Sequence, residues 1–135
     1  MELWEFVQKY NKEKIDFDKA FGYQCVDLFR QYCTDVLQVP HTGSVEGAKD
    51  LYLKYDKLPL ECQYFRRIKG VSGIKPGDVV IWDKSETNKY GHVAIYLAKE
   101  GNKLIVLEQN GYTQDGTKIS SKDNLNILGY LRFRK

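Results

Sequence analysis

The two halves of this 135-residue chain carry different hydrophobic patterns. Up to about residue 56, apolar residues recur at helical spacing, most clearly from Gln24 to the residue before Pro40. After the turn signal Lys75-Pro76-Gly77, the apolar residues instead form short runs that are separated by polar loops. Helices that are followed by an antiparallel succession of strands indicate an α+β fold.

The boundaries of these elements follow from the same patterns. Helices are predicted over residues 2–13, 24–39 and 45–56. Strands are predicted over residues 78–82, 92–98, 103–109 and 128–133. Residues 58–68 fit either a strand or an extended coil. The chain has no linker, repeat or low-complexity tract, so one domain is expected.

Composition excludes several classes of protein. The net charge of +3 is too small to indicate a nucleic-acid-binding protein. No apolar run approaches the length of a membrane span. The N-terminus carries charges throughout, so no signal peptide is predicted. Three scattered cysteines without a C-x-x-C pair indicate neither a disulfide framework nor a zinc site.

Cys25 is the candidate nucleophile. It lies in the first turn of the strongest predicted helix, where unpaired backbone N–H groups and the helix dipole favour a thiolate. Cys33 lies eight residues further along the same helical face and is expected to be a core residue. Cys62 receives no role. Because a cysteine that opens a helix is more often structural than catalytic, Cys25 needs a base nearby.

His92 is the better candidate of the two histidines for that base. It opens the alternating strand of residues 92–98, whereas His41 lies in a loop without an acidic or amide partner at useful spacing. A catalytic histidine is usually oriented by a third polar group. The next predicted strand ends with Glu108 and Asn110 on one face, and either side chain is suitable.

The hairpin between these two strands decides whether Glu108 reaches His92. A three-residue loop over residues 99–101 sets His92 directly opposite Glu108. A two-residue loop over residues 100–101 would instead set His92 opposite Gln109 and turn Glu108 to the other face. The first register is preferred, because it gathers the apolar side chains of both strands on the opposite face.

Four motifs follow one another along the chain. They are GYQCVDL at residues 22–28, PGDVVIW at 76–82, GHVAI at 91–95 and LEQN at 107–110. In this order they resemble the CHAP family, the cysteine- and histidine-dependent amidohydrolase/peptidase domains of phage endolysins and bacterial wall hydrolases. The resemblance covers roughly residues 14–133.

The resemblance implies a papain-like fold, in which N-terminal helices pack on an antiparallel sheet of about five to six strands. It implies that the whole chain, residues 1–135, is a single catalytic domain. It also implies that Cys25 is the nucleophile, that His92 is the base and that Glu108 orients the histidine. Asn110 matches a position near the histidine that often completes the site.

The reaction that the resemblance implies is hydrolysis of an amide bond in peptidoglycan. A bond in the stem peptide or the cross-bridge would make the protein an endopeptidase, and the sugar–peptide bond would make it an N-acetylmuramoyl-L-alanine amidase. Gln24 is a candidate oxyanion donor and equally a candidate helix cap. Trp82 and Tyr90 are candidates to line the substrate groove, although core or rim packing is the commoner role for such residues.

A calcium site is also expected, in the loop before Cys25. Its spacing mimics a twelve-residue EF-hand loop without the central glycine. The candidate ligands are the carboxylates of Asp16, Asp18 and Asp27 and the backbone carbonyls of Ala20 and Gly22. Some CHAP endolysins carry a calcium loop at this place, and a cation there would order the backbone that leads into the nucleophile. No organic cofactor is expected.

Two rival interpretations stay open. One is a papain-like thiol protease or acyltransferase that acts on a substrate outside the wall, and the other is a catalytically silent wall-binding or phage structural module. The expected partner is bacterial peptidoglycan, with neither nucleic acid nor membrane. The domain is expected to be a monomer that is made in the host cytoplasm and acts on the wall after release, either alone or joined to a wall-binding module.

Overall fold

The structure is a computed structural model, and it describes residues 1–15, 25–41, 43, 45–109 and 116–134. The helical elements are α1 (Leu3–Tyr10), α2 (Cys25–Tyr32), the π-helical turn η1 (Cys33–Leu37), α3 (Asp50–Leu53), the 3₁₀ turn η2 (Tyr55–Lys57) and α4 (Pro59–Tyr64). The strands are β1 (Phe65–Lys69), β2 (Val79–Trp82), β3 (His92–Glu100), β4 (Lys103–Gln109), β5 (Thr117–Lys122) and β6 (Ile127–Phe133).

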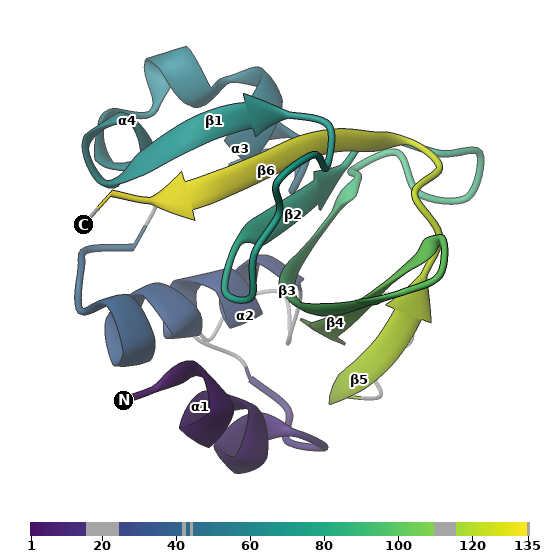
Figure 1. Cartoon of the computed structure of the whole chain (residues 1–135). Helices are drawn as coiled ribbons and strands as arrows, with labels where there is room; N and C mark the ends of the chain where they lie inside the picture. Colours follow the sequence, from purple (N-terminus) through teal and green to yellow (C-terminus); the bar gives the residue numbers. More distant parts are fainter. Residues whose placement is uncertain (16–24, 42, 44, 110–115, 135) are drawn as a thin grey trace.

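The strands form one six-stranded antiparallel sheet in the order β1-β6-β2-β3-β4-β5. The helices precede most of the sheet in the chain, and α2 packs against β3 and β4 near the middle of the sheet (Figure 1). The predicted α+β fold, with N-terminal helices on a sheet of about five to six strands, is confirmed. Within the described part of the chain, no helix has both the length and the apolar character needed to cross a membrane.

The predicted elements differ from the observed ones in three places. The segment 58–68, which fitted a strand or a coil, is α4 followed by β1. Its helix is short and begins with Pro59, which suits the first helical turn because proline lacks the N–H that would be unpaired there. The predicted helix over 45–56 shortens to α3 and η2. Strand β5 was not predicted, because it is an edge strand whose one large apolar residue, Ile119, is exposed.

The sheet is buried on both of its faces around β2. Alternate residues of β2 belong to two apolar clusters, which explains why this strand is an uninterrupted apolar run. The cluster on the helix side includes Phe6, Leu28, Phe29, Leu51, Val79, Ile81, Val93, Ile95, Leu107 and Leu131. The cluster on the other face consists of Val80, Trp82, Ala94, Tyr96, Leu104 and Val106.

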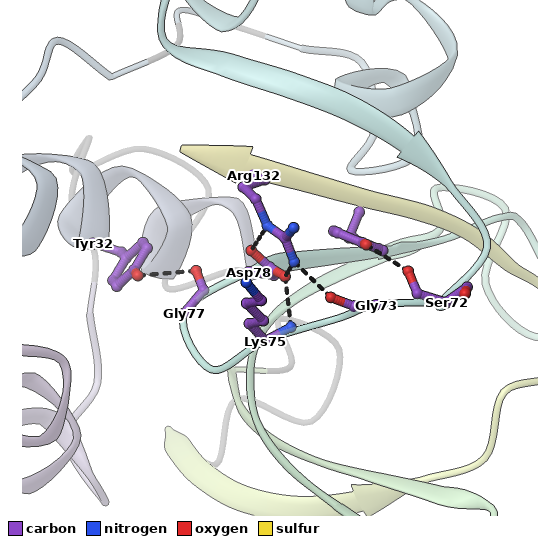
Figure 2. A network of polar contacts seen from close by, with 8 residues as sticks. Tyr32, Ser72, Gly73, Lys75, Gly77, Asp78 and Arg132 are labelled. Atoms are coloured by element: carbon purple, nitrogen blue, oxygen red, sulfur yellow. Dashed lines mark hydrogen bonds and ion pairs between the residues drawn. The ribbon is translucent and has the colours of Figure 1, made fainter. Parts of the chain in front are cut away.

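The buried carboxylate of Asp78 connects the turn before β2 to strand β6 by hydrogen bonds. Asp78 is 5% exposed, and its two oxygens accept hydrogen bonds from Arg132 of β6, from Nε at 3.1 Å and from Nη2 at 2.7 Å (Figure 2). Asp78 Oδ2 also accepts from the backbone N–H of Lys75 at 2.7 Å. One residue earlier, the carbonyl of Gly77 accepts from Tyr32 Oη of α2 at 2.9 Å. The same turn therefore holds the helix that begins with Cys25 against the sheet.

We expect the substitution Asp78→Ala to lower the free energy of unfolding by about 2–3 kcal/mol, because it leaves a partly buried guanidinium and a backbone N–H without their acceptor. Equilibrium unfolding in urea measures the loss. The matched control is Asp56→Ala, whose carboxylate lies 3.1 Å from Arg67 but is 77% exposed, so that its loss should cost less than about 1 kcal/mol. Equal losses in the two variants would contradict the stabilising role of Asp78.

Candidate active site

Cys25 is the first residue of α2 and is partly exposed. The three cysteines are all free thiols, but their surroundings differ. Cys33 is 1% exposed in the apolar core, and this burial, with a smaller contribution from Glu61, raises the pKa of its thiol. Cys62 Sγ donates a hydrogen bond to a backbone carbonyl at 3.0 Å. The expectation that Cys33 is a core residue is therefore confirmed.

His92 is the first residue of β3, and the residue before it determines how the strand starts. Gly91 has a φ of +75°, and a Cβ at this position would lie 2.4 Å from the carbonyl oxygen of Trp82. Glycine is therefore required here on both conformational and steric grounds. The Trp82 ring lies 5.6 Å from the His92 ring, centroid to centroid, and the Trp82 side chain is largely buried. These contacts restrict the orientation of the imidazole.

Glu108 is the third member of the arrangement. Its Oε1 lies 2.8 Å from His92 Nε2, and its side chain is 1% exposed. His92 also hydrogen-bonds the side chain of Cys25. Because Nε2 is engaged by the carboxylate, Nδ1 is the ring nitrogen that remains for the thiol. The three side chains thus form one hydrogen-bonded chain from Cys25 through His92 to Glu108.

The predicted contact between His92 and Glu108 is present, but the predicted hairpin register is wrong. The loop consists of residues 101–102, so that Glu100 pairs with Lys103, and neither of the two registers considered from the sequence occurs. A β-bulge between Tyr96 and Ala98 then shifts the register by one residue. The loop position has a signature in the sequence, because Gly101-Asn102 is a favoured two-residue hairpin turn, but the position of the bulge has none.

The bulge is what brings the histidine and the carboxylate to the same face of the sheet. Beyond it, Ile95 pairs with Leu107, and the same register makes Glu108 a diagonal neighbour of His92 on one face. Without the extra residue, the register at the loop would place Glu108 on the face of Ile95, away from His92, because side chains alternate between faces. The contact therefore depends on a backbone irregularity that lies several residues away from it.

The surroundings of His92 and Glu108 favour a positive charge on the imidazole and a negative charge on the carboxylate. Burial lowers the pKa of His92, but hydrogen bonds and Coulombic attraction to Cys25 and Glu108 outweigh it and raise the pKa from 6.5 to about 9. Burial raises the pKa of Glu108, but hydrogen bonds from His92 and Ser120 and the charges of His92 and Lys122 lower it from 4.5 to about 2. The carboxylate therefore stabilises the imidazolium form of His92, and the imidazolium in turn stabilises the carboxylate.

Two of the partners of Glu108 come from β5, the strand that the sequence did not reveal. Ser120 donates a hydrogen bond to the carboxylate, and Lys122 Nζ lies 3.2 Å from Oε1. Sequence analysis missed both residues because β5 has hardly any apolar pattern. The β-branched residues Thr117 and Ile119, two positions apart, are the one signal that indicates a strand here.

A cavity of about 480 Å³ adjoins the histidine. Its wall includes His92, Trp82, Lys122 and residues of the loops that follow β2 and β5. Trp82 is on the wall of this cavity and its ring also packs on the histidine, while its role in a substrate groove stays a prediction. Tyr90 is 49% exposed, and the residues that form the cavity wall do not include it.

Gln109, next to Glu108, anchors the segment that precedes the predicted calcium loop. Its side chain is fully buried and makes two hydrogen bonds of 2.7 Å with the backbone of Ile15, one to the N–H and one to the carbonyl. Thr117 of β5 donates to the same side-chain oxygen at 3.2 Å. The end of β4 therefore holds both the carboxylate of the site and the chain that leads toward Cys25. Sequence analysis assigned Gln109 no such role.

The remaining predicted residues fall mostly outside the described part of the structure. These are Asn110, Gln24 and four of the five candidate calcium ligands, Asp16, Asp18, Ala20 and Gly22. Asp27, the fifth, is 2% exposed, and its Oδ1 lies 3.2 Å from Arg30 Nη1. An arginine at this carboxylate competes with a metal ion for the oxygen. Among the described residues, no group of three or more acidic, histidine or cysteine side chains has the arrangement of a metal site.

Comparison with known proteins shows which family and which folds this chain resembles. A family model described as the CHAP domain matches residues 15–110, a stretch that includes Cys25, His92 and Glu108. Endolysin PlyTW of Staphylococcus phage Twort (strain DSM 17442 / HER 48) is 27% identical over 155 residues, which cover 98% of this chain and 30% of that protein. The chain thus spans less than a third of the length of this relative.

Solved structures share the fold. The crystal structure of the wild-type endolysin LysIME-EF1 matches with a TM-score of 0.67 and 19% identity over 98% of this chain and 64% of that one. The structure of Ly7917 matches with a TM-score of 0.72 and 16% identity, over 98% of this chain and 61% of that one. A second structure of Ly7917, with the hydrolysing product of MDP, has a TM-score of 0.71 and 18% identity over 97% and 61% of the two chains.

The substitution Glu108→Gln tests the electrostatic part of this site. Removal of the anion destabilises the imidazolium, so we expect the pKa of His92 to fall from about 9 by at least about one unit. Imidazole ¹⁵N NMR measures the change, because the chain has two histidines and a His41 variant assigns them. Asp56→Asn is the control, because its carboxylate is 77% exposed beside Arg67 and is not on the cavity wall, and it should leave the pKa nearly unchanged. A pKa in Glu108→Gln equal to that of the parent protein would contradict the assignment.

Proposed function

Because this chain belongs to the CHAP domain family, we propose that it is a peptidoglycan hydrolase in which Cys25 is the nucleophile. The observation that carries the proposal is the hydrogen-bonded chain from Cys25 through His92 to Glu108. A nucleophile, a base and a group that orients the base are the minimum set for thiol hydrolysis of an amide. The similarity to endolysins supports peptidoglycan as the substrate.

In the proposed mechanism, His92 takes the proton of Cys25 and the thiolate adds to the carbonyl carbon of the amide. The backbone N–H of Cys25, at the start of α2, donates to the oxyanion, and Gln24 is the proposed second donor. The imidazolium then gives its proton to the leaving nitrogen as the C–N bond breaks, which leaves a thioester. Water attacks the thioester with His92 as base, and the acid product and the free thiol are released.

Glu108 has two functions in this scheme. Its hydrogen bond to Nε2 fixes the ring so that Nδ1 faces the sulfur of Cys25. Its charge stabilises the imidazolium that forms when Cys25 is deprotonated, at a place where burial alone would disfavour that charge. The substitution Glu108→Gln should therefore lower the rate by at least about 100-fold even though a hydrogen bond remains possible.

The bond that is cut is either an amide of the stem peptide or cross-bridge, or the sugar–peptide bond. Both substrates offer an amide carbonyl to the same thiolate, so the Cys-His-Glu arrangement serves either reaction. We propose that the cavity beside His92 and Trp82 holds part of the substrate. Mass spectrometry of digested peptidoglycan separates the two reactions, because an endopeptidase frees amines within the peptides, whereas an amidase frees whole stem peptides from the sugars.

The substitutions Cys25→Ala and His92→Ala should each reduce clearing of suspended Gram-positive cell walls by at least about 100-fold while the protein stays folded. Turbidity measures clearing, and circular dichroism checks the fold. Cys62→Ser is the matched control, because serine retains a donor for the backbone carbonyl that Cys62 contacts. Full clearing by the Cys25 variant would exclude the proposed nucleophile.

The rival interpretations give different results in the same experiments. A thiol protease or acyltransferase with a different substrate would leave walls intact, although a thiol-reactive probe would still label Cys25 faster than Cys62. A silent wall-binding or structural module would show neither clearing nor preferential labelling, and the buried Cys33 should react slowest in every case. The parent protein alone therefore distinguishes the three classes.

We propose that calcium binds the loop over residues 16–27, with the Asp16 and Asp18 carboxylates among its ligands, and we propose no organic cofactor. Its expected role is to order the backbone before the nucleophile. Addition of calcium should raise the melting temperature, and Asp16→Ala combined with Asp18→Ala should abolish that rise. Asp83→Ala is a suitable control, because it removes a loop carboxylate elsewhere in the chain. A melting temperature that changes neither with added calcium nor with EDTA would contradict the proposed calcium site.

We also propose that residues 1–135 act as a monomeric catalytic domain. PlyTW is more than three times the length of the matched stretch, which favours the arrangement in which such a domain is joined to a wall-binding module. Synthesis in the host cytoplasm and action on the wall after release fit the same relative.

A further inference from the structure

Lys122 contacts the same carboxylate oxygen as the histidine of the site. Its Nζ lies 3.2 Å from Glu108 Oε1, and His92 Nε2 lies 2.8 Å from that atom. The ammonium and the imidazole nitrogen are therefore within about 6 Å of one another, because both contact a single oxygen. The Lys122 side chain is 38% exposed and reaches the carboxylate from β5.

We propose that Lys122 is a positioning residue of the hydrolytic site, which shares Glu108 with His92 and limits the net stabilisation of the imidazolium. The proposal rests on the proposed function of that site. The attraction between Glu108 and His92 is unchanged by the second cation, but the ammonium of Lys122 repels the imidazolium and so offsets part of the stabilisation that the carboxylate gives it. Lys122 therefore acts on His92 in the opposite direction to Glu108.

Other polar and charged groups lie near this cluster. Among the described residues they include the Cys25 thiol of α2, the Ser120 hydroxyl and Lys118 of β5, and Lys103, Asp83 and Asp123 on the cavity wall. Ser120 is neutral, and Lys118 is opposite Glu108 in the strand register. Lys122 differs from them in that its ammonium lies within ion-pair distance of the Glu108 oxygen that His92 contacts.

The chemistry explains why such a restraint is useful. His92 must give its proton to the leaving nitrogen, and proton transfer is most effective when the pKa of the donor lies near the working pH. Cys25 and Glu108 together raise the pKa of His92 to about 9, which favours retention of the proton. The ammonium of Lys122 opposes this rise in the pKa of His92 and so makes release of the proton easier. The carboxylate that orients the ring remains in place.

The test is the substitution Lys122→Met, which removes the charge at similar side-chain length. We expect the pKa of His92, measured by imidazole ¹⁵N NMR on the full chain, to rise by about half a unit, since partial exposure screens the interaction. The basic limb of the pH profile of wall clearing should move upward by the same amount. Lys122→Arg should leave both values at those of the parent protein, because it keeps the charge.

Lys99→Met is the matched control, because it removes the same charge from an exposed position at the far end of β3. It should leave the pKa of His92 within about 0.1 unit of the parent value. The proposal is overturned if Lys122→Met leaves the pKa unchanged or lowers it, or if Lys122→Arg shifts it as much as Lys122→Met. The titration needs no substrate, so it tests Lys122 even in a protein that fails to clear walls, a failure that would contradict the proposed function alone.

Discussion

The burial of one carboxylate, that of Glu108, is the constraint on which the arrangement of the site depends. A charged carboxylate that is 1% exposed is stable only if cations and hydrogen-bond donors surround it. Here they come from both neighbouring strands, His92 from β3 and Ser120 with Lys122 from β5. The position of β4 between these two strands is therefore as important to the chemistry as the identity of the carboxylate itself.

The nucleophile reaches this cluster because separate contacts hold α2 against the same sheet. Its inner face supplies Leu28 and Phe29 to the core, and Tyr32 bonds the carbonyl of Gly77 in the turn that Asp78 and Arg132 stabilise. That turn leads directly into β2, whose last residue, Trp82, pairs with His92. Contacts with β2 and the turn before it therefore position both α2 and His92. This shared support fixes the position of the Cys25 thiol relative to the imidazole.

Much of the fold was predictable, and the failures have physical causes. The change from helical to alternating patterns predicted α2, β2, β3 and β4, because these elements bury continuous or periodic apolar surface. The edge strand β5 carries little signal because one of its sides is exposed, and Lys122 was missed with it. The position of a strand such as β5, which has no apolar pattern, is determined by its pairing with a neighbouring strand. A single sequence does not reveal which strands pair.

The pairing of His92 with Glu108 shows how a correct contact can follow from an incorrect register. The sequence predicted that they share a face, but the hairpin achieves this with a loop at a different position and a compensating bulge near Leu97. With the loop at residues 101–102, the bulge is needed to return both side chains to one face. A single insertion or deletion within the paired part of either strand, between the loop and the site, would therefore turn one of the two side chains to the other face. The geometry of the site constrains the backbone far from the reacting atoms, which is why a residue as remote from the thiol as Leu97 belongs to the functional structure.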